Sequence, residues 1–254
     1  MFAVPDLNLL IVPLCAGVLV LATHVPLGRE VLRRGIIFID LAIAQVAGLG
    51  VMAAQLAGWG NAEGGPDFAT QITAALAACA GALLLTWSGR RWPEIQEALI
   101  GLLFVISACV SILLLAHSPQ GGEHLRDLLA GQILWVTWPQ LLVPAAVYAV
   151  LLALWLRYGQ RLGDVGFYLV FALTVTLSVQ LVGVFLVFAS LIAPALASRH
   201  LPGRAGAWRG YWVGFVAYAL GLVLSSVVDL PPGPMVVCFL GGAAVSGLLP
   251  KRKR

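Results

Sequence analysis

The sequence predicts an all-α, polytopic membrane protein with about nine transmembrane helices. Of its 254 residues, 61% are hydrophobic and only 10% are charged, whereas soluble domains carry roughly 25% charged residues. The run from residue 165 to residue 197 contains no Asp, Glu, Lys, Arg or His. The Lys and Arg residues gather in short clusters between apolar runs, which is typical of loops on one side of a membrane.

Helices are favoured over barrel strands by the length of the uncharged run. Lipid offers no partners to backbone N–H and C=O groups, so a spanning chain forms either helices or a closed barrel. Barrel strands alternate polar and apolar residues over about ten positions. The run 165–197 is too long and too uniformly apolar for that alternation.

The spans are predicted from apolar stretches near the required length of about 20 residues. The N-terminal residues show neither the charged region nor the cleavage pattern of a signal peptide, so we expect the first span to be retained. Seven stretches qualify directly: 7–23, 35–58, 68–87, 98–116, 139–156, 211–228 and 235–249. The stretch 165–197 is too long for one comfortable crossing and short for two.

Charge decides how often the stretch 165–197 crosses. All Lys and Arg residues except Arg126 fall into five clusters, around residues 29–34, 90–91, 157–161, 199–209 and 251–254. If these clusters are all cytoplasmic, the chain between Arg161 and Arg199 crosses an even number of times and turns near Gly183. Nine spans result, with the N-terminus outside and the C-terminus in the cytoplasm. The outer loops then carry mainly acidic residues.

Several classes of function are excluded by missing motifs. A P-loop requires a Lys followed by Ser or Thr after a Gly-rich turn, and Lys251 and Lys253 are each followed by Arg. Neither an HExxH helix nor a GxSxG turn is present, so we predict that the chain is not an enzyme and binds no cofactor. The pI of about 9.1 is explained by membrane orientation, and we predict no nucleic-acid partner.

Four segments, in order along the chain, carry a resemblance to a known family. They are "LGREVLRRGIIFIDLAIAQVAGLGV" (27–51), "DLLAGQILWVTWPQL" (127–141), "VGVFLVFASLIAPALASR" (182–199) and "SSVVDLPPGPMVV" (225–237). Together they resemble the zinc and manganese permease family of ABC transporters, which is related to the vitamin B12 and siderophore importers. The resemblance implies the fold of a type II ABC importer permease, as a single transmembrane domain over residues 1–254.

The resemblance also implies a function and partners. It implies a permease that moves a divalent metal ion, zinc or manganese, across the bacterial inner membrane. The expected partners are an ABC ATPase on the cytoplasmic side, an extracytoplasmic substrate-binding protein, a second permease copy and membrane lipid. Two alternatives stay open: an ABC permease for a metal chelate or another small substrate, and an ion-coupled secondary carrier. A carrier would usually show paired intramembrane charges and repeated halves, and neither is found in the sequence.

Two segments depart from the family pattern. In the family an Asp and a His stand one helical turn apart on an early helix. Here Gln45 takes the His position and Leu41 the Asp position, while Asp40 lies about 140° around the helix from Gln45. The family's ATPase-docking segment is shorter in this chain. The docking candidates are Tyr158, Gly159, Gln160, Arg161, Leu162 and Gly163.

Four polar residues are candidates for the substrate pathway. Asp40 is an ionisable residue at the start of a span, where it either meets the substrate or pairs locally near the inner interface. Gln45 either lines the path or bonds a neighbouring helix, and Gln180 carries the same two readings. Asp229 is held by a Pro-rich turn at the outer end of two spans. No metal ligand set is assigned. A short amphipathic helix is expected over residues 124–138, at the outer interface.

Overall fold

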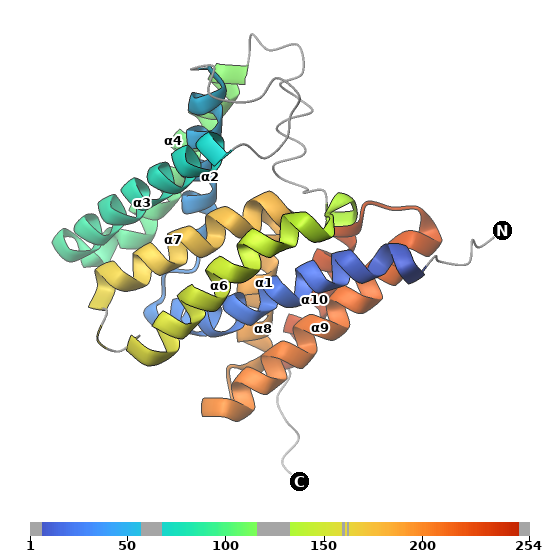
Figure 1. The fold of residues 1–254 in the computed structure, drawn as a ribbon. Helices are drawn as coiled ribbons and strands as arrows, with labels where there is room; N and C mark the ends of the chain where they lie inside the picture. Colours follow the sequence, from blue (N-terminus) through green and yellow to red (C-terminus); the bar gives the residue numbers. More distant parts are fainter. Residues whose placement is uncertain (1–6, 57–67, 116–132, 159–160, 162, 249–254) are drawn as a thin grey trace. The chain divides into compact units, whose positions relative to one another are not determined.

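The architecture of the chain is entirely helical over the residues that the computed structural model describes, namely 7–56, 68–115, 133–158, 161 and 163–248 (Figure 1). These residues form nine α-helices and two short 3₁₀ turns, Pro93–Ile95 and Ile133–Trp135. The helices are α1 (Leu7–Arg34), α2 (Ile39–Leu56), α3 (Phe68–Arg91), α4 (Gln96–Leu115), α6 (Trp138–Tyr158), α7 (Gly163–Val182), α8 (Val184–Ser198), α9 (Gly203–Val228) and α10 (Pro232–Leu248).

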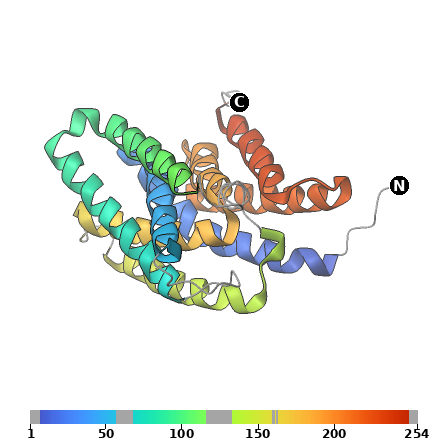
Figure 2. The same cartoon turned by 90° about the horizontal axis from the view of Figure 1, so that it is seen from above.

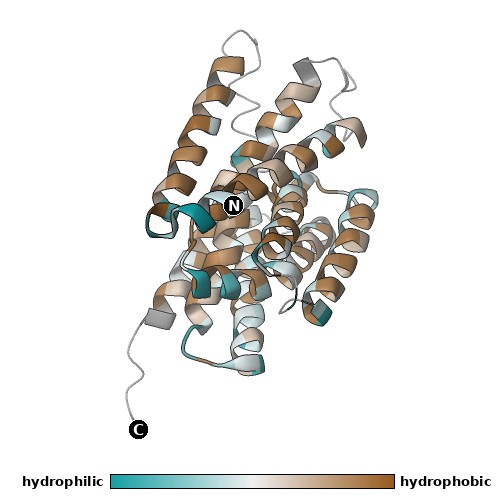
Figure 3. Cartoon of the chain, turned by 90° about the vertical axis from the view of Figure 1, so that its left-hand side faces the viewer, coloured by the Kyte–Doolittle hydropathy of each residue, from teal (hydrophilic) through white to brown (hydrophobic). Residues whose placement is uncertain are grey.

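The helices have the length and hydropathy of membrane spans. Six of them are long and apolar enough to cross a bilayer, and α2, α8 and α10 are shorter apolar helices. Apolar residues predominate along the helices, and hydrophilic residues concentrate at helix ends and connections (Figure 3). The prediction of a multi-span, all-α membrane protein with about nine helices is therefore confirmed for the described residues.

The division of the long apolar run is confirmed at the predicted glycine. Helix α7 ends at Val182 and α8 begins at Val184. Gly183 between them has φ 83° and ψ 162°, a conformation that is essentially restricted to glycine. A residue with a Cβ would be strained there, so the break is encoded by this glycine.

The first helix is longer than predicted. The expected span 7–23 continues to Arg34, because Leu27 and Val31 keep the apolar face going and the polar Thr23 hydroxyl bonds to the helix's own carbonyl at Val20. The helix stops at Gly35, which has φ 71° and so ends it in the left-handed conformation that glycine favours. Most of the amphipathic helix expected at 124–138 lies outside the described residues.

The chain divides into two compact units, each described here by itself. The first contains Met1–Gly35, Leu129–Tyr148 and Gln180–Arg254, and the second contains Ile36–Leu128 and Ala149–Val179. The first unit is built on α1, α8, α9 and α10, which pack against one another, and the second on α2, α3 and α4. The single transmembrane domain expected from the sequence stays a prediction.

In the first unit, α1 and α9 run antiparallel with glycine opposite a larger side chain at successive turns. In a membrane, helices associate mainly through van der Waals packing rather than through the hydrophobic effect. Glycine strengthens this packing because it lets the helix backbones approach closely. At each step, a Cβ added to the glycine would collide with the facing residue. The pairs are Gly17 with Tyr218, Leu21 with Gly214, Val25 with Gly210, and Arg29 with Gly206.

Two connections of the first unit are fixed by hydrogen bonds. The guanidinium of Arg29 donates to the carbonyl of Leu201 (3.2 Å), in the connection between α8 and α9, and to that of Gly203 (2.7 Å), the first residue of α9. At the other end of α9, the chain turns at Asp229 and α10 diverges from α9 (Figure 2). The first connection is thus held by a contact from α1, and the second by the hydrogen bond from the Leu230 N–H to the Ser225 carbonyl.

In the second unit, α2 is the central helix. It contacts both α3 and α4, and nearly every side chain described along it is buried or half-buried. Gly50 permits the close approach of α3, since a Cβ there would lie 2.7 Å from the carbonyl oxygen of Thr73. A mainly apolar helix that is buried on most of its faces belongs in the interior of a helix bundle, and α2 occupies such a place within its unit.

Candidate functional site

Asp40 lies in the first turn of α2 and is 1% exposed. Neither carboxylate oxygen has a hydrogen-bond partner of ordinary geometry among the described residues, although the backbone N–H groups of Asp40 and Leu41 approach the carboxylate. The partial positive charge of a helix N-terminus favours an acidic side chain in this turn. Asp40 is therefore a buried carboxylate that retains capacity to bind a cation or a proton.

Gln45 lies five residues further along the same helix and is 8% exposed. No hydrogen bond from its side chain to a neighbouring helix is found within the described parts of the chain. The role of Gln45 in the substrate pathway stays a prediction.

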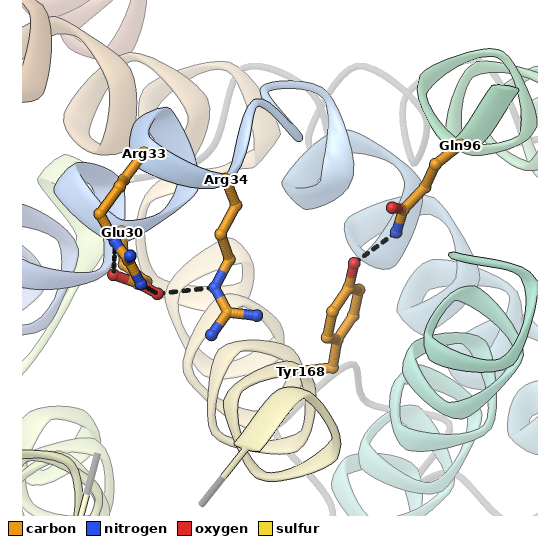
Figure 4. A network of polar contacts seen from close by, with 5 residues as sticks. All are labelled: Glu30, Arg33, Arg34, Gln96 and Tyr168. Carbon is orange, nitrogen blue, oxygen red and sulfur yellow. Dashed lines mark hydrogen bonds and ion pairs between the residues drawn. The ribbon is translucent and has the colours of Figure 1, made fainter. Parts of the chain in front are cut away.

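The first turn of α4 reaches the segment that precedes α2. Glu97 accepts a hydrogen bond from the backbone N–H of Ile37 at 2.9 Å through Oε1, while its Oε2 is buried without a partner in the described structure. Its neighbour Gln96 donates to the hydroxyl of Tyr168 on α7 (Figure 4). Sequence reasoning missed Glu97, and its signal was a single acidic residue at the start of an apolar span.

The two remaining pathway candidates lie in the first unit and are exposed. Gln180 stands in the last turn of α7. Asp229 caps α9 in the left-handed conformation, with φ 56°, and its N–H donates to the carbonyl of Ser225. The N–H of Leu230 donates to the same carbonyl at 3.1 Å. The turn predicted around Asp229 is present, and the structure gives this residue a helix-capping task.

A fully buried histidine in α1 was also missed from the sequence. His24 is 0% exposed, and its Nε2 atom has no hydrogen-bond partner among the residues that the structure describes. The predicted first span stopped one residue before it, at Thr23. An ionisable residue inside an apolar helix is the signal that could have identified His24.

The Arg34 end of α1 carries an ion-pair cluster. The carboxylate of Glu30 accepts hydrogen bonds from Arg33 and Arg34 one helical turn further on (Figure 4). Arg33 is 72% exposed, and exposed pairs of this kind contribute little to stability. The cluster shows where the polar end of α1 begins.

The predicted ATPase-docking segment is described in part. Tyr158 ends α6 with an exposed ring, and the guanidinium of Arg157 lies 5.7 Å from its centroid. The N–H of Arg161 donates to the carbonyl of Tyr158 at 2.7 Å, and Gly163 opens α7 with φ 60°. Gly159, Gln160 and Leu162 lie outside the described residues. Docking at this segment stays a prediction.

No preassembled metal centre is present in the described residues, since no group of three or more His, Cys, Asp or Glu side chains could hold a metal ion there. Asp40 and Gln45 share one helix of the second unit, and Gln180 and Asp229 belong to the first.

Comparison with known proteins connects this helical architecture to a family. The family model described as "ABC 3 transport family" matches residues 6–162 and 159–250, a stretch that includes all nine described helices. The chain belongs to the ABC 3 transport family. This assignment confirms the resemblance noted from the four sequence segments.

Relatives of this ABC 3 protein are found in two chlamydial species. Proteins described as "Probable metal transport system membrane protein" in Chlamydia trachomatis serovar D and Chlamydia muridarum are each 25% identical to it, over 184 and 183 residues. The alignments cover 64% of this chain and 62% of each relative. The chain therefore spans less than two thirds of the length of these relatives.

A solved structure shares the fold of this ABC 3 protein. The structure described as "PsaBC from Streptococcus pneumoniae in complex with Fab" aligns with 96% of this chain and 90% of its own, with a TM-score of 0.72 and 20% sequence identity. The likeness extends over nearly all of the chain, and it agrees with the fold expected from the sequence.

Proposed function

We propose that this ABC 3 protein is the permease subunit of an ATP-binding cassette importer that carries zinc or manganese across the bacterial inner membrane. The observation that carries the proposal is the family match over all nine described helices. The description of both chlamydial relatives as membrane proteins of metal transport systems supports a metal as cargo.

The proposal requires an ATPase as a separate chain. The sequence contains no P-loop, so the energy for transport comes from a cytoplasmic partner that docks near residues 158–163. A substrate-binding protein delivers the metal from outside, and two permease copies form the complete translocator. In this orientation the basic clusters are cytoplasmic, the N-terminus lies outside and the C-terminus lies inside.

Asp40 gives the proposed pathway an anionic group inside the protein. Its buried carboxylate lacks a hydrogen-bond partner of ordinary geometry in the described structure, and the helix N-terminus compensates a buried charge only in part. A divalent cation in transit would supply that compensation briefly. Because no cluster of several ligands surrounds it in the described residues, the cation would be bound weakly enough to leave.

The test is uptake of radioactive zinc and manganese into vesicles that contain the chain together with its cognate ATPase and binding protein. We expect ATP-dependent accumulation of at least one metal, no ATPase activity from the purified chain alone, and a complex with two copies of each subunit. Asp40→Asn should lower metal uptake while complex assembly persists. Transport that proceeds without an ATPase and follows an ion gradient would contradict the proposal and favour a secondary carrier.

A further inference from the structure

His24 is placed inside the helix packing of the first unit. It lies in the middle part of α1, roughly 15 Å from the Arg34 end at 1.5 Å per residue. The glycines one turn after it and two turns before it lie on the same face. A Cβ at Gly28 would meet the carbonyl oxygen of Leu191 on α8, and one at Gly17 would meet the Tyr218 ring on α9. His24 therefore belongs to the face of α1 that packs against α8 and α9.

The hydrogen bonds of His24 define which ring nitrogen carries the proton. Its Nδ1 atom lies 2.9 Å from the carbonyl oxygen of Val20 and 3.1 Å from the hydroxyl oxygen of Thr23. A carbonyl oxygen can only accept, so Nδ1 is the protonated nitrogen. The Thr23 hydroxyl donates to the same carbonyl at 3.1 Å, which leaves its oxygen free to accept. In the neutral ring, Nε2 then carries a lone pair.

This arrangement is the one that metal-binding histidines use. A ligating imidazole usually donates its other ring N–H to a carbonyl or carboxylate, which fixes the ring and directs the lone pair to the metal. In His24 the carbonyl of Val20 takes that part. Nε2 has no hydrogen-bond partner in the described structure, although an unpartnered buried acceptor is destabilising.

We propose that Nε2 of His24 is a transient ligand for the divalent metal as it passes through the first unit. The proposal rests on the proposed function and deepens it, because it names a residue and a ligand type for the cargo. A neutral imidazole favours zinc over manganese, in line with the general order of affinities for first-row metals. His24 therefore shifts selectivity toward zinc.

The test separates the structural bond of His24 from its free nitrogen. In His24→Asn the side-chain amide can still donate to the carbonyl of Val20, but no nitrogen remains at the Nε2 position. In His24→Gln the amide reaches toward that position with a weaker, neutral oxygen. Ser198→Ala is the matched control, because Ser198 is also buried in the first unit and bonds to the carbonyl four residues earlier, at Pro194.

The measurements are uptake of radioactive zinc and manganese by vesicles with the full complex, and zinc retained per purified complex. For His24→Asn we expect the apparent KM for zinc to rise about tenfold and that for manganese to rise clearly less, with lower zinc retention. His24→Gln should change the ratio of the apparent KM for zinc to that for manganese in the same direction. The control should leave the ratio unchanged.

The ratio distinguishes a ligand from a structural histidine. If assembled His24→Asn and His24→Gln complexes keep the wild-type ratio and zinc retention, Nε2 binds only water or packs unpaired, and the inference is wrong. If only Gln changes the ratio, the Val20 bond is responsible and the inference is equally wrong. Failure of the wild-type complex to move either metal would instead contradict the proposed function.

Discussion

The hydroxyl of Tyr211 on α9 donates a hydrogen bond to the carbonyl oxygen of Ala22 on α1, at 3.2 Å. Ala22 stands four residues before Pro26, one of two prolines inside this helix. Because proline has no N–H, the Ala22 carbonyl lacks its usual donor within the helix. Tyr211 supplies the missing donor from a neighbouring helix, as broken helical bonds in membrane proteins require.

We therefore predict that Tyr211→Phe destabilises the protein by about 1–2 kcal/mol, because it leaves a half-buried carbonyl without a donor. In a Pro26→Ala background, the backbone N–H gained at position 26 restores the helical bond, and the same substitution should have a much smaller effect. The measurement is a double-mutant cycle on detergent-solubilised protein, followed by thermal or SDS-induced unfolding. Equal losses in both backgrounds would show that the two residues act independently.

The closest packing contact of α1 predicts the effect of adding a methyl group. In Gly28→Ala the new Cβ would overlap the Leu191 carbonyl oxygen, which is backbone and cannot rotate away. We expect a loss of about 1–3 kcal/mol. Gly101→Ala on α4 is the control, since no described atom lies within 4 Å of the added Cβ, and it should be neutral or stabilising. Similar unfolding midpoints for both variants would contradict the observed contact.

We predict that Arg29 protects the connection between α8 and α9 from proteolysis. Arg29→Gln removes both hydrogen bonds to the carbonyls of Leu201 and Gly203, so trypsin should cleave faster after Arg199 and Arg204. Arg29→Lys keeps the charge but not the forked geometry and should give an intermediate rate. Arg33→Gln serves as the control because Arg33 is largely exposed. Unchanged cleavage at both sites in Arg29→Gln would exclude this anchoring role.

Because Gln45 stands where the family has a histidine, we predict that the metal binds only weakly as it passes α2. Gln45→Ala should change uptake only modestly, because an amide oxygen is a weak ligand for zinc. Gln45→His combined with Leu41→Asp creates a His and an Asp one turn apart and should increase the metal retained by the membrane subunit. Uptake and bound metal are counted in parallel. Loss of all uptake in a well-folded Gln45→Ala complex would make Gln45 an essential ligand or gate.

The orientation of the chain is tested by cysteine labelling. From outside, a membrane-impermeant reagent should reach cysteines introduced at residues 59–67 and 121–127, but none at 90–94 or 199–209. The basic clusters place the latter two on the cytoplasmic side. The native cysteines are first replaced, since Cys109 and Cys238 are exposed. Inverted accessibility at any two of these loops would overturn the nine-span topology.

The fold could be predicted largely from hydropathy and charge, because the bilayer permits few alternatives. The break at Gly183 followed from counting basic clusters, and the structure has it at that residue. The end of α1 could not be located in this way, because His24 and Thr23 interrupt the apolar pattern. Their hydrogen bonds within the helix show why polar residues did not end it.

The candidate site was less predictable than the fold. Asp40 could be selected as an ionisable residue in an apolar segment, and it is buried. Asp229 was selected for a different reason, its place in a Pro-rich turn, and the structure has it as an exposed helix cap. Its part in the substrate pathway stays a prediction. The free Nε2 of His24 and the free Oε2 of Glu97 depend on which neighbours are absent from the described structure, and such absences have no signature in one sequence.

A side chain gained on α1 must be matched by one lost on α9, because the facing positions share a single volume. Leu21 occupies the space above Gly214 and Val25 that above Gly210, while Tyr218 takes the space that Gly17 leaves open. Among related sequences, these positions should change in pairs, with the combined volume of each pair nearly constant. Where position 21 carries a small residue, position 214 should carry a larger one, because the two substitutions compensate each other in volume.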